Sequence, residues 1–405
     1  MRNNKLLDRT YSFHSSPMSQ SRKASQTNLV LPKATSNVRN RIIFTLVMIL
    51  MFAAIIYIGH IGLLLLVVLL QTLVFKEVIS IAHVPSKEMK LPWFRTLIWY
   101  FFISTLYFLY GARLQDYWDH PILREVHKNH RLKSYALYCI GMVLFVLNLK
   151  KKHIRFQFGQ LAFTLVTLIL VVWQSHFIVE NIMEGMIWFV LPVSLVVCND
   201  IMAYIVGKLF GRTPLISLSP KKTWEGFIGA FILTLIFSYF YSGFLAQFPL
   251  LTQPYNASSE LVDSTFVKKT FDLLEIMNIS LPGFLTSRYP WIGSFLRVSM
   301  RPIQFHAVMM AIFASIIAPF GGFFASGVKR AFKVKDFADS IPGHGGVTDR
   351  MDCNLLTGLF SHIYLFTFIK PKTVTLLQVA NLVRRLTLED QTKLMTMMKE
   401  MLNVK

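Results

Sequence analysis

The sequence contains few cysteines and few acidic residues. It has three cysteines in 405 residues, and their spacing matches neither a metal-binding motif nor a paired disulfide framework. Cys139, Cys198 and Cys353 each lie in or beside an apolar segment, which favours buried, unreactive thiols. Aspartate and glutamate total 21 against 42 lysines and arginines, so the formal net charge is +21.

This positive charge does not indicate nucleic-acid binding. No basic surface module with interleaved aromatic residues is visible, and the lysines and arginines gather in short loops and tails. Such loops hold a chain to the cytoplasmic side of a membrane. A basic membrane face also attracts anionic lipid, nucleotide or phosphate.

Long apolar runs dominate the rest of the chain. Hydrophobic residues make up 54%, charged residues only 16%, and the mean hydropathy is +0.48. A spanning helix needs about 20 mostly apolar residues. About nine segments qualify: 42–58, 61–82, 93–111, 134–149, 159–178, 185–207, 226–247, 305–325 and 354–369. The sequence therefore predicts an all-α, polytopic integral membrane protein with about nine transmembrane helices.

Three regions follow from this pattern. Residues 1–41 are polar, serine-rich and basic, with no apolar signal-peptide core, and we expect a disordered cytosolic tail. Residues 42–370 form the transmembrane domain. Residues 371–405 are expected to form an amphipathic helical tail, with Thr387 as a candidate cap.

Counting crossings from a cytosolic amino end predicts the orientation of the loops. The basic loops 83–92, 150–158, 208–225 and 326–353 all fall on the cytosolic side. The long loop 248–304 falls in the lumen, where Asn256 and Asn278 begin glycosylation sequons. An odd number of crossings puts the carboxyl tail in the lumen unless one segment is re-entrant, so its side is left open.

The first chemical constellation lies at residues 198–226. Asp200 sits within an apolar helix, where a carboxylate costs about 2.5–3.5 kcal/mol and is by default a functional candidate. Ala203, Tyr204 and Gly207 share its helical face. The following loop offers cations and hydroxyls for a polyphosphate: Lys208, Arg212, Ser217, Ser219, Lys221, Lys222 and Thr223. A cytosolic anchor obeying the charge bias explains this loop equally well.

The second constellation lies at residues 326–356. Lys329, Arg330, Lys335 and Asp336 precede the segment Pro342-Gly-His-Gly-Gly346, whose glycines predict a tight loop with backbone N–H groups free to bind an anion. The first turn of the next helix contains Asp349, Arg350 and Asp352. Carboxylates three apart share a helix face, and such a pair suits Mg²⁺.

Each part of this stretch also has an ordinary explanation. His344 alone would suggest packing or a loop hydrogen bond, and Asp349 and Asp352 alone would suggest solvated acids at a helix start. The combination of cations, acids and a glycine loop at a membrane surface instead favours phosphoryl chemistry.

At these residues the chain resembles the phosphatidate cytidylyltransferase family, also called CDP-diacylglycerol synthases, in its eukaryotic branch. The upstream stretch 198–226 is also similar, and the resemblance covers roughly residues 40–370. The fixed positions of the family motif are matched by Ser326, Lys329, Arg330, Lys335, Asp336, Ala338, Ile341, Pro342, His344, Gly345, Gly346, Asp349, Arg350 and Asp352.

The resemblance implies that CTP and phosphatidic acid react to give CDP-diacylglycerol and pyrophosphate, with Mg²⁺ as cofactor and no nucleic-acid partner. It also implies a multi-pass protein of the endoplasmic reticulum membrane, in contact with membrane lipid, with its active site facing the cytosol. Bacterial relatives are dimers, so a homodimer is a candidate assembly. Those relatives carry an acid that helps to hold metal where this chain has Gly322, so Asp200 or Asp336 would complete the metal site.

The resulting hypothesis assigns roles to the motif residues. Asp349 and Asp352 hold Mg²⁺, and Lys335 or Arg350 holds the phosphatidate phosphate, while His344 orients it or assists its last proton. No general base is needed if that phosphate is already ionised. Lys221, Lys222, Lys329 and Arg330 clamp the polyphosphate, and Ser219, Thr223, Ser326, Gly345 and Gly346 complete the expected substrate-binding set. The expected catalytic residues are Asp336, His344, Lys335 and Arg350.

Two other functions remain open from the sequence. A CTP-dependent polyprenol kinase would transfer the γ-phosphate and release CDP. A lipid or phosphate transporter would use the basic loops for recognition, but it predicts charged residues near mid-membrane on several helices, whereas most acids here lie at one surface.

Overall fold

The computed structural model describes residues 34–88, 92–111, 128–216, 219, 222–255, 277–279, 298–341, 345–370, 383–384 and 386–403. Two predicted site residues, Lys221 and His344, lie outside these ranges, as does most of the predicted amino-terminal tail.

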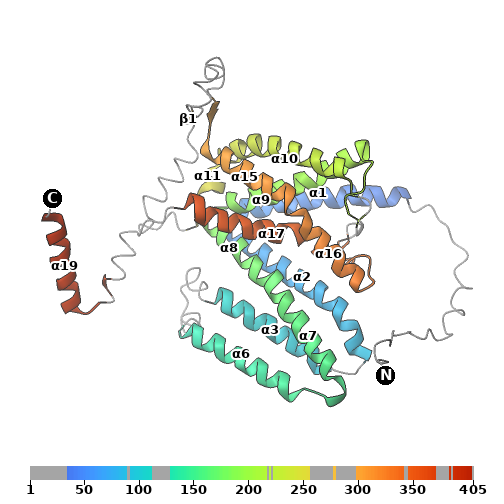
Figure 1. Ribbon diagram of the computed structural model, residues 1–405, viewed down its shortest axis with the longest axis horizontal. Coiled ribbons are helices and arrows are strands. Elements are labelled where there is room, and N and C mark those ends of the chain that lie inside the picture. Colours follow the sequence, from blue (N-terminus) through green and yellow to red (C-terminus); the bar gives the residue numbers. More distant parts are fainter. Residues whose placement is uncertain are drawn as a thin grey trace, which may run out of the picture.

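The described chain is a series of helices (Figure 1). The first half contains α1 (Ala34–Ile58), α2 (His60–Glu88), α3 (Pro92–Tyr110), α6 (His130–Leu147), η2 (Lys151–His153), α7 (Ile154–Thr167), η3 (Leu168–Trp173), α8 (Gln174–Glu184) and α9 (Ile187–Phe210). The second half contains α10 (Trp224–Leu245), α11 (Pro249–Thr252), α15 (Pro302–Ile316), α16 (Pro319–Ala331), α17 (Thr348–Tyr364), η4 (Leu365–Ile369) and α19 (Leu388–Asn403).

Every segment predicted to span the membrane falls on helical structure. Among the described residues, six stretches are long and apolar enough to cross a membrane: His60–Ala82, His130–Leu147, Lys151–Glu184, Ile187–Phe210, Trp224–Leu245 and Pro302–Ala331. This confirms a helical membrane protein, while the count of about nine crossings stays a prediction. α1 begins at Ala34 rather than at residue 42, because hydropathy marks only the apolar part of a helix and its water-facing end tolerates charge.

One element departs from a purely helical fold. β1 (Met277–Ile279) and β2 (Val298–Met300) pair antiparallel, with Asn278 opposite Ser299. Both strands lie in the predicted lumenal loop 248–304. They place the second sequon asparagine in β1, whereas Asn256 lies outside the described residues.

Small residues bring α9 and α10 into close contact. A Cβ atom added to Gly226 would approach the Ala203 carbonyl oxygen to 2.9 Å and the Gly207 Cα to 3.0 Å. Such packing lets two membrane helices touch along their backbones. The buried core beside this pair is formed by α8, α9, α15 and α17 and includes Ile182, Leu191 and Leu195.

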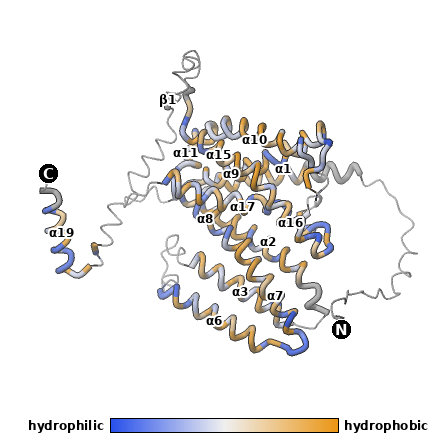
Figure 2. Tube along the Cα trace, in the orientation of Figure 1, coloured by the Kyte–Doolittle hydropathy of each residue, from blue (hydrophilic) through white to orange (hydrophobic). Residues whose placement is uncertain are grey.

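The polar connections gather toward one side of the helical body. In Figure 1 the α6–α7 connection, the amino end of α10 and the carboxyl end of α16 all point to the right of the view. Figure 2 shows hydrophilic residues at the α6–α7 connection and at the end of α16, whereas the helices between are mostly hydrophobic. The basic loops therefore share one side of the protein, as the charge pattern predicts.

Candidate active site

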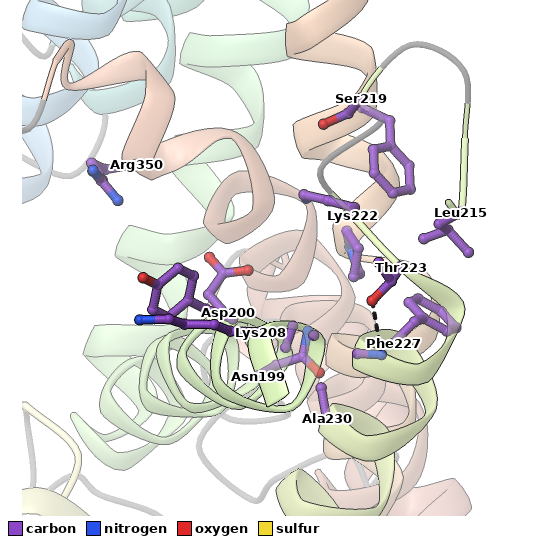
Figure 3. A pocket seen from close by; sticks show the side chains of 16 residues that line it. Asn199, Asp200, Lys208, Leu215, Ser219, Lys222, Thr223, Phe227, Ala230 and Arg350 are labelled. Carbon is purple, nitrogen blue, oxygen red and sulfur yellow. Dashed lines mark hydrogen bonds between the residues drawn. The ribbon is translucent and has the colours of Figure 1, made fainter. Parts of the chain in front are cut away.

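A cavity of about 480 Å³ opens between α9, α10 and α16, and it contains much of the first constellation (Figure 3). The face of α9 predicted from spacing lines it with Asp200, Ala203, Tyr204 and Gly207. Its polar lining also includes Lys208, Ser219, Lys222, Thr223 and Arg350. Cations and a carboxylate thus meet in a space large enough for a ligand the size of a nucleotide.

The loop between α9 and α10 folds back on itself to place Lys222. The Leu215 N–H donates to the Lys222 carbonyl at 2.7 Å, and the Trp224 N–H donates to the Thr213 carbonyl at 3.0 Å. Thr223 then caps α10, because its hydroxyl oxygen accepts from the Gly226 N–H at 3.2 Å. Glu225, in the first turn of α10, holds the first part of the loop, because its Oε1 accepts a hydrogen bond from the Thr213 hydroxyl at 2.8 Å.

The Asp200 carboxylate lies near enough to act on the charge of Asp352, and both acids interact with Lys222. A Cβ atom at Gly322 would lie 3.4 Å from Asp352 Oδ2 and 3.7 Å from Lys222 Nζ. The position where bacterial relatives carry an acid therefore faces this group. Burial raises the pKa of the Asp352 carboxyl above its ordinary value, opposed by the hydrogen bond from the Cys353 N–H and by Lys222.

Asp200 and Asp352 are candidate ligands for a divalent cation. Mg²⁺ usually takes one or two protein carboxylates and completes its shell with water and substrate phosphate. Among the described residues, no group of three or more His, Cys, Asp or Glu side chains could hold a metal ion. The three predicted ligands Asp200, Asp349 and Asp352 thus do not form one cluster of three, so the predicted three-carboxylate set is not assembled in this arrangement.

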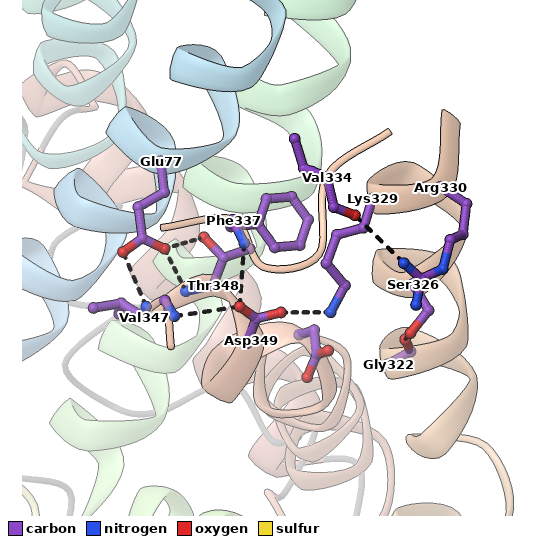
Figure 4. A network of polar contacts seen from close by, with 12 residues as sticks. Glu77, Gly322, Ser326, Lys329, Arg330, Val334, Phe337, Val347, Thr348 and Asp349 are labelled. Carbon is purple, nitrogen blue, oxygen red and sulfur yellow. Dashed lines mark hydrogen bonds and ion pairs between the residues drawn. The ribbon is translucent and has the colours of Figure 1, made fainter. Parts of the chain in front are cut away.

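Asp349 belongs to a separate network beside the pocket (Figure 4). Its Oδ1 lies 2.6 Å from Lys329 Nζ, and its Oδ2 accepts from the N–H groups of Phe337 and Gly346, each at 3.3 Å. Asp349 and Asp352 share the first turns of α17, yet they have different neighbours. In this arrangement Asp349 anchors the loop between α16 and α17.

The glycine loop has the close geometry that its sequence predicts. Gly345 has φ +81°, in the left-handed region, and its carbonyl accepts from the Ile341 N–H at 2.9 Å. Asp336 lies against it, since a Cβ atom at Gly345 would be 3.8 Å from Asp336 Oδ1. The structure therefore brings Asp336, Gly345 and Gly346 together with Asp349.

The remaining predicted residues occupy the edge of this network. The Ser326 hydroxyl donates to the Gly322 carbonyl at 2.8 Å, and Arg330 Nη1 donates to the Val334 carbonyl at 3.5 Å. Lys335 is exposed on the connection from α16. Lys221 and His344 lie outside the described residues, so the roles predicted for them stay predictions.

Sequence reasoning missed one carboxylate, Glu77 of α2. It is 4% exposed and accepts hydrogen bonds from the α16–α17 connection and from the start of α17 (Figure 4). The signal was present, because Glu77 is an acid within a predicted spanning segment, the same feature that identified Asp200.

Comparison with known proteins identifies relatives over most of the chain. The model of the cytidylyltransferase family matches residues 39–368. The human protein named phosphatidate cytidylyltransferase 2 is 45% identical over 368 residues, which cover 88% of this chain and 82% of the relative. Phosphatidate cytidylyltransferase 1 of Rattus norvegicus is 46% identical over 357 residues (85% of this chain, 77% of the relative). A putative phosphatidate cytidylyltransferase of Schizosaccharomyces pombe is 43% identical over 358 residues (85% and 79%).

Proposed function

We propose that this chain, which belongs to the cytidylyltransferase family, transfers the cytidylyl group of CTP to phosphatidic acid and forms CDP-diacylglycerol and pyrophosphate. The observation that carries this function is the pocket in which Asp200, Lys222 and Arg350 meet, in a chain 45% identical to a phosphatidate cytidylyltransferase over most of its length. The product would supply phospholipid synthesis.

The pocket suggests how the two substrates are divided. Lys208 and Lys222 come from α9 and the loop before α10, and they are placed to neutralise the triphosphate of CTP together with hydroxyls of Ser219 and Thr223. Arg350 enters from α17 and is suited to hold the phosphate of phosphatidic acid, because a guanidinium binds phosphate oxygens in pairs. Lys335 and the loop residue His344 are assigned to the same headgroup, and Arg330 is assigned to the phosphates of CTP.

The reaction is a single displacement at phosphorus. An oxygen of the phosphatidate phosphate attacks the α-phosphorus of CTP, the new P–O–P bond forms, and the bond from the α-phosphorus to the bridging oxygen of pyrophosphate breaks. The electron pair of that bond leaves on pyrophosphate. Because the attacking phosphate is ionised near neutral pH, the protein mainly neutralises charge and aligns the reactants.

We assign the divalent cation to Asp200 and Asp352 in preference to Asp349, whose oxygens already accept from Lys329 and two backbone N–H groups. Bound Mg²⁺ would supply charge neutralisation to phosphate oxygens. In this assignment Asp200 of α9 takes the role of the acid that bacterial relatives carry at the position of Gly322.

The membrane setting suits this reaction. The basic loops on one side of a multi-pass protein support a site at the cytosolic face of the endoplasmic reticulum membrane, where CTP is available and the lipid remains in its leaflet. A homodimer is part of the same proposal. It rests on the resemblance to dimeric bacterial relatives.

The products of the purified protein test this function. Protein in lipid nanodiscs is incubated with CTP, Mg²⁺ and phosphatidic acid, and lipid and nucleotide products are identified by mass. The proposal expects CDP-diacylglycerol and pyrophosphate in equal amounts. In a parallel reaction that also contains a polyprenol, CDP with phosphorylated polyprenol would instead identify the kinase. In sealed vesicles, movement of lipid or phosphate across the membrane without any product would identify a transporter.

A further inference from the structure

α17 begins without a capping side chain of its own. The residue at its N-cap position is Val347, whose side chain cannot accept a hydrogen bond. The first N–H groups of a helix have no partner within the helix and need an acceptor from elsewhere. The start of α17 is also buried at Val347 and Thr348, so water cannot serve that purpose freely.

Glu77 supplies the missing acceptors from α2. Its Oε1 accepts from the Val347 N–H at 3.0 Å, and its Oε2 accepts from the Thr348 N–H and hydroxyl, both at 2.8 Å. The Ser340 hydroxyl donates to Oε1 at 2.5 Å. All of these donors are neutral groups of residues 340, 347 and 348. A carboxylate is a favourable acceptor there, because the amino end of a helix favours negative charge.

Glu77 and Asp349 hold the same loop from opposite sides. A Cβ atom at Gly346 would lie 2.8 Å from Glu77 Oε2 and 3.2 Å from Asp349 Oδ2. The loop therefore passes between the two carboxylates with no space for a side chain. Its position is fixed relative to α2 by Glu77 and relative to α16 by the Asp349–Lys329 ion pair.

The first turns of α17 carry Arg350 and Asp352, and only the first of these lines the cavity. Arg350 lines the cavity, and Asp352 lies with Asp200 and Lys222. A shift of this turn would move Arg350 and Asp352 together, but it would leave Lys208 and Lys222 in place because they belong to α9 and to the loop before α10.

We propose that Glu77 is a positioning residue for cytidylyl transfer. It fixes the start of α17, so that Arg350 and Asp352 are held at the positions from which they act on the substrate phosphates. This inference rests on the proposed function. Glu77 does not line the cavity itself, and it serves as the amino-terminal cap of a helix 270 residues away in sequence.

The test compares Glu77→Gln with wild type in the full-length protein in nanodiscs. A glutamine amide keeps the size of the side chain but presents N–H groups to backbone N–H donors, so it cannot satisfy both Val347 and Thr348. We expect turnover per CTP-binding site to fall at least tenfold. The number of CTP molecules bound per chain and the Kd for CTP should change less than threefold.

Amide hydrogen exchange supplies a second measurement that does not depend on activity. In Glu77→Gln the amides of Val347 and Thr348 should exchange at least tenfold faster, with no change in peptides of α9 and α10. Thr348→Ala, which removes only the hydroxyl contact, should show a smaller loss of turnover and keeps the test available if Glu77→Gln does not fold. Glu184→Gln is the matched control, because Glu184 pairs with Lys370 away from the pocket.

The outcomes separate the possibilities. Turnover per CTP site within twofold of wild type in Glu77→Gln would overturn the positioning role, and so would unchanged exchange at Val347 and Thr348. An equal loss of turnover in Glu184→Gln would also overturn it, since the effect would then be general destabilisation. Absence of CDP-diacylglycerol from the wild-type protein would refute the proposed function instead, while the exchange result would still report on the cap.

Discussion

Lys329 Nζ lies 2.6 Å from Asp349 Oδ1, with only 15% and 13% of the two side chains exposed. This ion pair joins the end of α16 to the first turn of α17 across the glycine loop. Lys329 also lies over the Phe337 ring, with Nζ 5.6 Å from its centre. The pair therefore ties the last turn of α16 to the residues that follow Gly346.

Lys329→Met should destabilise the protein because it leaves the Asp349 carboxylate enclosed without its cation. Removing one partner of a buried ion pair costs about 3–5 kcal/mol, and the partial exposure here favours the lower end. The double variant Lys329→Met/Asp349→Asn should recover part of the loss in thermal unfolding midpoint. Losses that simply add in the double variant would show that the two residues are not coupled.

Asp200→Asn and Asp352→Asn should each lower turnover at least 100-fold, because each removes half of the carboxylate pair assigned to the cation. Raising Mg²⁺ should not restore turnover fully. The measurement is initial rate against Mg²⁺ concentration with labelled CTP in purified membranes.

Asp349→Asn is the informative comparison for that experiment. Its effect should appear mainly as a lower unfolding midpoint, with a Mg²⁺ dependence close to that of wild type. Near-normal turnover of Asp352→Asn across the Mg²⁺ titration, or a shifted Mg²⁺ dependence in Asp349→Asn alone, would contradict the assignment.

Lys222→Met should raise the KM for CTP by about tenfold, equivalent to about 1.4 kcal/mol of binding. Methionine keeps the unbranched apolar part of the side chain but removes the ammonium group, whose Nζ lies 4.6 Å from the centre of the Phe323 ring. Lys393→Met is a control, since Lys393 is an exposed residue paired with Glu389 on α19. An unchanged KM in Lys222→Met would exclude this lysine from nucleotide binding.

Gly346→Ala should strongly impair both folding and turnover, because the added methyl group would lie 2.8 Å from Glu77 Oε2. Gly159→Ala in α7 offers a matched control, as no atom lies within 4 Å of its added Cβ. That control should be stabilised by about 0.4–1 kcal/mol through reduced freedom of the unfolded chain. Thermal unfolding compares the two, and equal behaviour would argue against a tight passage at Gly346.

Hydropathy and charge were enough to predict the helices and the shared side of the basic loops. They did not predict the small β1–β2 pair, because three-residue strands carry too little periodicity to recognise. Hydropathy also predicted only the apolar part of α1, because polar residues can extend a helix beyond its apolar segment.

The sequence predicted which residues gather near the candidate site, but not which of them contact one another. Spacing correctly put Asp200, Ala203, Tyr204 and Gly207 on one face, because a helix has a fixed period. The same rule suggested that Asp349 and Asp352 act as a pair, whereas tertiary contacts give them different partners. Local sequence also gave no means of connecting Glu77 with residues near 347, since only the packing of α2 beside α17 brings them together.

The most direct test follows the two labelled phosphates of CTP into product. Wild-type protein and Asp200→Asn are incubated with Mg²⁺, phosphatidic acid and CTP labelled either at the α- or at the γ-phosphate. The account predicts α-label in the lipid fraction and γ-label in pyrophosphate for wild type, with at least 100-fold less lipid label for Asp200→Asn. Recovery of the γ-label in lipid, or full α-label transfer by Asp200→Asn, would contradict it.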